Sequence, residues 1–350
     1  MSESSNKSVL IVGAGGFIGG FIAAEALRRG YRVWAAVRES TSRRYLTDPR
    51  LHFVVLDYDN PETLGPALSE AAPADTGRWD WIIYNLGATK CTNFMDFNRI
   101  NYGYLRDFTA ALQQTGLVPE RFLYMSSLSA LGPGDETTYA PLTARTVPEP
   151  NTRYGVSKIK AETHLQTLAD FPWIIFRPTG VYGPHEQDYL MMIKSIDRHF
   201  DFGVGYRKQL LTFIYVDDLV NAMFDALESA AGAVEHHKYI IAEGRAYTQA
   251  EFRKIVADAL GGKWVVPVKL PLWAVQAVSV VAEKIGVLRM KPSTLNRDKF
   301  RIMRQRNWDC DISDAQRDFG FTPRVTLEEG IARTVKSYRE AQAAEKARKK

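Results

Sequence analysis

Residues 8–20 have the sequence SVLIVGAGGFIGG, in which a short apolar run leads directly into a glycine-rich turn. A β-branched run, glycines at 13, 16 and 19, and a helical pattern after them are together typical of a dinucleotide-binding βαβ unit. In such a unit Gly13 permits the tight turn, Gly16 lets the backbone approach a pyrophosphate, and Gly19 lets helix and strand pack closely. The phosphates would then lie at the N-terminus of the helix, which favours anions.

On the C-terminal side of this motif, short β-branched runs alternate with helical segments. The runs lie at 9–12, 32–37, 52–56, 81–85, 121–126 and 173–177, and apolar spacing predicts helices at 17–29, 98–115 and 154–169. This alternation predicts an α/β fold of the Rossmann type, a doubly wound parallel sheet with crossover helices. After residue 177 the alternation breaks down, which indicates a smaller C-terminal substrate lobe.

The domain boundaries are expected to follow this break. Residues 1–176 would form the dinucleotide-binding domain, and residues 211–228 would return to it. The substrate-binding lobe would consist of residues 177–210 and 229–340, and residues 341–350 would be a basic tail.

Composition narrows the classes of function. A chain of 350 residues with 45% hydrophobic and 24% charged residues can bury a substantial core. Its two cysteines, Cys91 and Cys310, suit neither a disulfide framework nor a zinc site, so we expect no metal. The net charge of +5 is too small to indicate a nucleic-acid partner. The polar start MSESSNKS lacks the pattern of a secretory signal, so a cytoplasmic protein is expected.

One segment is unusually apolar. Residues 270–288, LPLWAVQAVSVVAEKIGVL, are interrupted by Gln276, Ser279, Glu283 and Lys284, which argues against a membrane span. A helix packed on the core is one interpretation. The alternative is a lid or a face that lies on a membrane to collect a lipid substrate, so peripheral membrane contact stays open.

The end of the second predicted strand indicates the preferred dinucleotide. NAD sites usually place an acid there, about 20 residues after the glycines, whereas this strand ends in Arg38. A guanidinium offers a bidentate fork for a 2′-phosphate, so NADP(H) is predicted, with NAD(H) as the alternative. Arg43 and Arg44 either reinforce this site or are simply solvated. Asp57, after the third strand, either accepts a hydrogen bond from an adenine amino group or caps its own loop.

A tyrosine and a lysine supply the reactive groups. Tyr154 and Lys158 stand four apart in RYGVSKIKAE, so on a helix they project from one face. A free tyrosine titrates near pH ~10, so it needs a nearby cation to exchange protons at neutral pH. Ser127 lies at a predicted strand end in LYMSSLSALG. It is placed to hydrogen-bond the substrate carbonyl with which Tyr154 exchanges its proton, and to hold that carbonyl for hydride attack.

Over nearly the whole chain, these motifs resemble the extended short-chain dehydrogenase/reductase family, also called the NAD-dependent epimerase/dehydratase family. GAGGFIG resembles the family's GxxGxxG, LGA at 86–88 its cofactor-floor motif, and FNRINYG with Asn101 its structural asparagine. MSSLSALG resembles the serine motif and YGVSK the YxxxK motif. RPTGVYGP at 177–184 and FIYVDDL at 213–219 resemble two further family signatures.

The resemblance implies roles for individual residues. Tyr154 would donate the proton, Lys158 would lower its pKa and hold the nicotinamide ribose, and Ser127 would polarise the carbonyl. Asn101 would anchor a proton-relay water. Cofactor contacts are expected from Gly13, Gly16, Phe17, Ile18, Gly19, Arg38, Asp57, Tyr58, Leu86, Gly87, Ala88, Tyr154, Lys158, Pro178, Gly180 and Val181. Besides Ser127, substrate contacts are expected from four residues that are equally suited to loop or packing roles: Lys90, Tyr182, His185 and Tyr206.

The branch of the family bears on the substrate. Sugar-nucleotide epimerases of the family usually grip the diphosphate with an arginine at the position that Leu211 occupies here. The segments LLTFIYVDDLV and KLPLWAVQAV instead look similar to the steroid dehydrogenase-like and dihydroflavonol reductase-like branches. The leading hypothesis is an NADPH-dependent ketoreductase for a hydrophobic ketone, such as the lipid intermediate 3-keto-sphingoid base.

Two other hypotheses and one assembly state stay open. The first is a nucleotide-sugar epimerase or dehydratase with tightly bound NAD. The second is a non-catalytic dinucleotide-binding sensor. A homodimer is expected through the helices at 98–115 and 154–169, because both are apolar enough for a four-helix interface.

Overall fold

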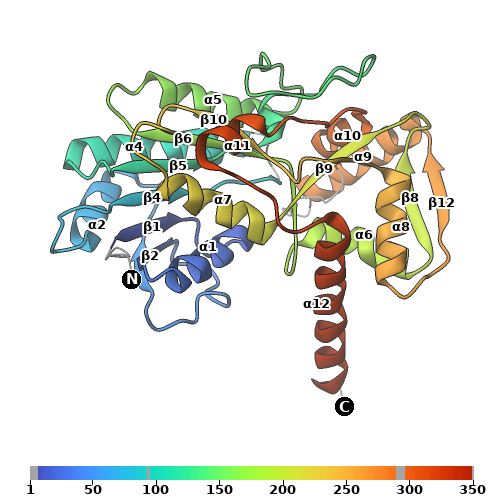
Figure 1. Ribbon diagram of the computed structural model, residues 1–350, viewed down its shortest axis with the longest axis horizontal. Helices are drawn as coiled ribbons and strands as arrows, with labels where there is room; N and C mark the ends of the chain where they lie inside the picture. The colour runs from blue at the N-terminus through green and yellow to red at the C-terminus, as the bar shows by residue number, and fades with distance from the viewer. Residues whose placement is uncertain (1–6, 92, 94, 289–295, 349–350) are drawn as a thin grey trace.

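The computed structural model describes residues 7–91, 93, 95–288 and 296–348. Within these residues, seven parallel strands form the central sheet in the order β10-β6-β5-β4-β1-β2-β3 (Figure 1). The strands are β1 (Ser8–Val12), β2 (Arg32–Val37), β3 (His52–Val55), β4 (Trp81–Tyr84), β5 (Arg121–Met125), β6 (Trp173–Pro178) and β10 (Lys238–Ile241). The order reverses between β1 and β4, where doubly wound sheets bind their ligands. The predicted Rossmann-type fold is confirmed.

Helices cover both faces of this sheet. On one face lie α1 (Phe17–Arg28) and α7 (Val216–Glu228), and on the other α2 (Leu64–Ala71), α4 (Tyr104–Thr115) and α5 (Arg153–Thr167). Successive side chains of a strand point to opposite faces. Accordingly, Val9 and Ile11 of β1 belong to the apolar cluster under α1 and α7, whereas Leu10 and Val12 belong to the cluster under α4.

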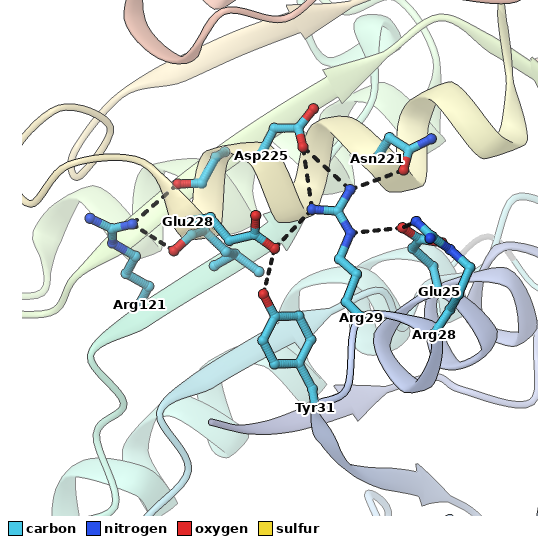
Figure 2. A network of polar contacts seen from close by, with 10 residues as sticks. Glu25, Arg28, Arg29, Tyr31, Arg121, Asn221, Asp225 and Glu228 are labelled. Atoms are coloured by element: carbon cyan, nitrogen blue, oxygen red, sulfur yellow. Dashed lines mark hydrogen bonds and ion pairs between the residues drawn. The ribbon is translucent and has the colours of Figure 1, made fainter. Parts of the chain in front are cut away.

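A polar network fastens α7 to the C-terminal end of α1 (Figure 2). The guanidinium of Arg29 donates hydrogen bonds to Glu25 (2.7 Å), Asn221 (3.0 Å) and Glu228 (2.8 Å). The hydroxyl of Tyr31 also donates to Glu228. Residues 216–228 therefore pack on the sheet domain through α1.

Two strands differ from the sequence expectation. Strand β10 lies inside the range 229–340 assigned to the lobe, yet it pairs in parallel with β6, with Ile240 opposite Arg177. The long insertion between β6 and α7 hides this last strand-helix-strand unit from a sequence pattern. Conversely, β9 (Leu210–Tyr215), expected beside the main sheet, pairs with β7 (Gly180–Tyr182) and β11 (Ala246–Thr248) in a separate sheet.

Helix boundaries also shift. The segment 98–115 divides into α3 (Met95–Asn98), a π-helical turn η2 (Arg99–Gly103) and α4. The apolar segment 270–288 forms a helix only from Leu272 onward, because residues 266–270 are a strand. Short 3-10 turns occur at η1 (Pro61–Thr63) and η3 (Leu128–Ala130).

The lobe packs around its own apolar cluster, which contains Phe213, Phe252 and Ile331. Its strands β8 (Phe200–Val204) and β12 (Val266–Leu270) form a two-stranded sheet. The remaining helices are α6 (Gln187–Asp197), α8 (Gln249–Ala259), α9 (Leu272–Leu288), α10 (Arg297–Arg304), α11 (Ser313–Phe319), which packs on β10, and α12 (Leu327–Arg348). The predicted basic tail continues α12 through 348, and residues 349–350 lie outside the described residues. Among the described helices, none is both long and apolar enough to cross a membrane.

Candidate active site

The predicted site residues gather at one edge of the main sheet. Gly13 follows β1, Arg38 follows β2, Leu86 lies just after β4, Ser127 just after β5, and Pro178 ends β6. Because the strands are parallel, their carboxyl ends meet at the same edge. The structure thus brings together residues that span nearly half of the chain, from Gly13 to Pro178.

The three glycines of the motif are glycine for different physical reasons. Gly13 has φ +83°, and a Cβ atom on it would lie 2.9 Å from Cα of Leu86. A Cβ on Gly19 would lie 2.3 Å from the carbonyl oxygen of Gly13. A Cβ on Gly16 would meet that same oxygen only at 3.5 Å, an ordinary contact. The protein's own packing therefore does not require glycine at 16, which fits close approach of a ligand there.

The N-terminus of α1 is open to an anion. Its N-cap, Gly16, provides no side-chain cap, and the first turn contains no acidic residue. Phe17 and Ile18 are half-buried against the core, so their contribution to a ligand would come from backbone N–H groups. Across the edge, the buried Thr179 hydroxyl, between Pro178 and Gly180, has no hydrogen-bond partner among the described residues. These features fit a bound dinucleotide.

Arg38 is exposed at the end of β2. Its backbone N–H donates to Oγ1 of Thr41 (3.0 Å), while its guanidinium has no ion pair within the described part of the chain. Arg43 and Arg44 instead lie over aromatic rings, at 4.3 Å and 4.4 Å from the ring centroids. An unpaired guanidinium is therefore available at the position where a 2′-phosphate is expected.

The adenine-side candidates lie in the loop after β3. Asp57 accepts hydrogen bonds from the backbone N–H of Asp59 (3.1 Å) and from Nδ2 of Asn60 (2.5 Å), so it caps this loop. The Tyr58 side chain is buried under the sheet, and this burial raises its pKa. The adenine contact of these two residues stays a prediction.

Helix α5 holds Tyr154 and Lys158, the predicted catalytic pair, next to the end of β5. Nζ of the buried Lys158 donates to the carbonyl of Met125 (2.7 Å). Burial lowers the pKa of Lys158 to about 7, against an opposing effect from the negative charge of Glu162. Burial raises the pKa of Tyr154, and a hydrogen bond with the Ser127 side chain opposes this shift. The serine, tyrosine and lysine thus lie together.

Asn101 connects residues 86–88 to helix α5. Its Oδ1 accepts from the N–H of Ala88 (2.7 Å), and its Nδ2 donates to the carbonyl of Ala88 (3.0 Å) and to Oγ of Ser157 (2.9 Å). A Cβ on Gly87 would lie 3.1 Å from both Nζ of Lys158 and Oδ1 of Asn101. The π-helical turn that carries Asn101 is a feature often found at functional sites. Asn101 positions its neighbours here, and its relay water stays a prediction.

Comparison with known proteins places this geometry in a family. Residues 9–242 match the NAD dependent epimerase/dehydratase family. The chain belongs to this family. It is therefore an NAD(P)-dependent oxidoreductase of the extended short-chain dehydrogenase/reductase type.

Relatives of this epimerase/dehydratase family member differ in their reactions. It is 23% identical over 343 residues to a UDP-glucose 4-epimerase of Vibrio cholerae, covering 96% of both chains. It is 23% identical over 341 residues to a ceramide reductase of Caulobacter vibrioides, covering 97% of both. A 3-beta-hydroxysteroid dehydrogenase of Mycolicibacterium neoaurum is 25% identical over 343 residues, with 94% of this chain and 91% of that one covered.

The shared fold extends over the whole length. The structure of a UDP-glucose 4-epimerase from Thermotoga maritima superposes with a TM-score of 0.74 over 96% of this chain and 99% of that one. The sequence identity is 19%, so this likeness concerns the fold alone.

Among the further substrate candidates of this family member, Lys90 has contacts in the lobe. Its ammonium group forms an ion pair with Asp188 of α6, which also pairs with Lys299 of α10 at 3.0 Å. This cluster connects the loop after β4 to two helices of the lobe. Lys90 is therefore held next to the lobe by partners that sequence reasoning missed.

The other substrate candidates lie elsewhere. Tyr182 is 1% exposed in the lobe core, where its hydroxyl donates to the carbonyl of Thr326 (3.3 Å), so it is not open to a ligand. His185 packs on the ring of Tyr45, with centroids 4.5 Å apart, which agrees with the packing alternative. Tyr206 is 66% exposed in the turn after β8, outside the group around Tyr154.

Two buried carboxylates support the site without a motif of their own. Oδ2 of Asp298 accepts from the N–H groups of Arg153 (3.0 Å) and Tyr154 (3.4 Å), which fastens α10 to the start of helix α5. Glu162, fully buried, pairs with Arg177 at 2.5 Å. Glu162 lies four residues after Lys158 on the same helix face, a spacing that was visible in the sequence. Asp298 gives no such signal, because its contacts lie about 145 residues away.

Proposed function

We propose that this protein is an NADPH-dependent ketoreductase that acts on a hydrophobic ketone, with a long-chain lipid intermediate such as a 3-keto-sphingoid base as the most specific candidate. Leu211 carries the proposal. It occupies the position where epimerases of the family usually have the diphosphate-binding arginine, and it packs against apolar clusters of both the sheet domain and the lobe. Next to it, Oγ1 of Thr212 donates to the carbonyl of Trp308 (2.7 Å). This position offers a diphosphate no charge.

The chemistry that these residues support is carbonyl reduction. Bound NADPH would supply the hydride to the carbonyl carbon. Ser127 hydrogen-bonds the carbonyl oxygen, and Tyr154 donates its proton to that oxygen as the alcohol forms. Lys158 favours the phenolate left on Tyr154, because a neighbouring cation stabilises the charged form. The names ceramide reductase and 3-beta-hydroxysteroid dehydrogenase among the relatives support an apolar substrate.

Turnover of a lipid ketone tests this function directly. We expect the purified chain to oxidise NADPH when a 3-keto-sphingoid base is added in detergent micelles, with the matching alcohol as product. UDP-glucose and UDP-glucuronic acid serve as comparison substrates, and mass spectrometry identifies the products. Turnover of a sugar nucleotide, with the lipid ketones left unreduced, would overturn the proposal.

Arg38 is expected to set the cofactor preference. Arg38→Ala should weaken NADPH binding by about 10- to 100-fold, because a charge-assisted hydrogen bond contributes about 1.5–3 kcal/mol, and leave NADH binding nearly unchanged. Fluorescence titration with both cofactors measures this. Arg50→Ala is the matched control, since that arginine is also exposed but is paired with Asp48. Equal loss of NADPH and NADH affinity in Arg38→Ala would contradict the assignment.

A nucleotide-sugar epimerase or dehydratase is the second candidate, favoured by the names of the Vibrio and Thermotoga relatives. That function requires a tightly held NAD. Protein that retains NAD through purification and binds a UDP-sugar would support it against the reductase. A non-catalytic sensor is the third candidate, and it would be revived if the Tyr154 hydroxyl proved dispensable in cells.

A further inference from the structure

The sheet formed by β8 and β12 has its apolar face outward. Its register pairs Phe200 with Val266 and Phe202 with Val268, and paired residues lie on the same face of a sheet. Phe200 is 45% exposed, Phe202 53% and Val266 42%. The opposite face carries Asp201, which is buried and accepts from the guanidinium of Arg253 (3.3 Å). This is the reverse of the usual arrangement, in which the apolar face packs on the core.

Helix α9 extends this apolar surface. Trp273 is 74% exposed, Val278 56% and Val281 57%, although the opposite side of the helix packs inward through Val275. Leu272, 45% exposed, lies against the turn after β8, where a Cβ on Gly205 would be 3.7 Å from its side chain. Figure 1 shows β8, β12 and α9 together at the end of the molecule away from β1 to β3. We call these exposed apolar side chains of β8, β12 and α9 the end surface.

The charges on the same segments have one sign. In residues 199–208 and 264–285 the exposed charged side chains are all basic and form no ion pair among the described residues: Arg207, Lys208, Lys284 and Lys269. Lys269 pairs with Gly203, so it lies on the Asp201 face of the sheet, and the other three are the candidates for the end surface. Of the acids there, Asp201 is buried, and Glu283 accepts from the N–H of Arg297 (3.0 Å). Exposed Trp and Phe side chains flanked by Lys and Arg suit the interface of an anionic bilayer. A second copy of the chain fits less well, because a two-fold interface would oppose these cations without an acidic partner.

We propose that the end surface binds the surface of an anionic lipid bilayer. Membrane binding by the end surface does not depend on the proposed function. Its use for collecting a lipid substrate does rest on the proposed ketoreductase function. Glu283 of α9 lies 3.9 Å from the guanidinium of Arg153, the residue before Tyr154. Asp298 of α10 caps the same helix start. The end surface is therefore joined to helix α5 through α9 and α10, so a lipid ketone would enter beside the site.

Vesicle flotation with the full-length protein tests the proposal. We expect binding to vesicles of phosphatidylcholine with phosphatidylglycerol and much weaker binding to phosphatidylcholine alone. The variant Phe202→Ser/Trp273→Ser should lower the partition coefficient by about ten-fold or more, because each substitution removes an aromatic side chain that would be buried in the bilayer interface. Arg207→Gln/Lys284→Gln should reduce the preference for phosphatidylglycerol several-fold, since basic side chains near an anionic bilayer strengthen binding.

The controls separate this proposal from the reductase function. Val147→Ser, at a side chain that is 75% exposed elsewhere, should bind vesicles like the unchanged protein. Unaltered NADPH affinity shows that each variant is folded. Absence of binding to phosphatidylglycerol vesicles, or equal binding by the Phe202/Trp273 variant, overturns the proposal even if lipid ketones are reduced. Vesicle binding without ketone turnover would support membrane binding by the end surface and would exclude the proposed lipid ketone as substrate.

Discussion

Tyr154→Phe is expected to lower kcat by about 1,000-fold, within the range of about 10²–10⁴ that a positioned acid or base contributes. Phenylalanine keeps the ring and its contact with Phe97, whose centroid lies 6.3 Å away, so the site should keep its shape. Only the hydroxyl that Ser127 contacts is removed. Steady-state kinetics with the ketone that the unchanged enzyme turns over, together with NADPH titration, measures both effects.

The expected signature is a loss in kcat with dinucleotide affinity retained. Tyr139→Phe is a matched control, since its hydroxyl donates to the carbonyl of Lys208 (2.8 Å), outside the site, and its kcat should not change. If the Tyr154→Phe enzyme kept more than a tenth of the activity, the assignment of Tyr154 as the proton donor would be wrong.

Local sequence signals predicted the part of the site nearest the glycine-rich turn. Positions 13 and 19 require glycine, because a Cβ atom at either would clash with the backbone, and the glycine motif in the sequence indicates this requirement. Tyr154 and Lys158 needed only helical spacing to share a face. Family membership confirmed the enzyme class that these motifs predicted. Short-range patterns are informative where function depends on backbone approach or on a single helix.

Patterns failed where a partner is distant in the chain. The Asp188 contacts of Lys90 and Lys299 span 98 and 111 residues, so no window of sequence contains them. Tyr182 belongs to a family-like motif but packs into the lobe core, which a motif cannot distinguish from a ligand contact. Likewise, the outward apolar face of β8 and β12 depends on distant contacts, because Asp201 on the other face accepts from Arg253, 52 residues away.

The ion pair between Glu162 and Arg177 is expected to give the largest stability effect. Glu162→Gln should lower the free energy of unfolding by about 3–5 kcal/mol, because it leaves a buried guanidinium without its counter-charge. Glu162 is 0% exposed and Arg177 1% exposed. The carboxylate also accepts from the hydroxyl of Ser126 (2.5 Å), at the end of β5, so an amide could not replace all of its contacts. Denaturant unfolding measures the loss.

Two further variants isolate the charge effect in this pair. Glu162→Leu/Arg177→Met removes both charges together, so it should recover much of the lost stability, since apolar replacement of a buried pair is often neutral. Asp48→Asn breaks an exposed pair with Arg50 and should leave the free energy of unfolding nearly unchanged. The negative charge of Glu162 raises the pKa of Lys158, so Glu162→Gln should lower that pKa. As pH rises, Lys158 then loses its proton earlier, and the activity of the folded variant should fall at a lower pH than that of the unchanged protein. A free energy of unfolding for Glu162→Gln within about 1 kcal/mol of the unchanged protein would contradict the role of the buried pair. An unshifted profile of activity against pH would contradict its influence on Lys158.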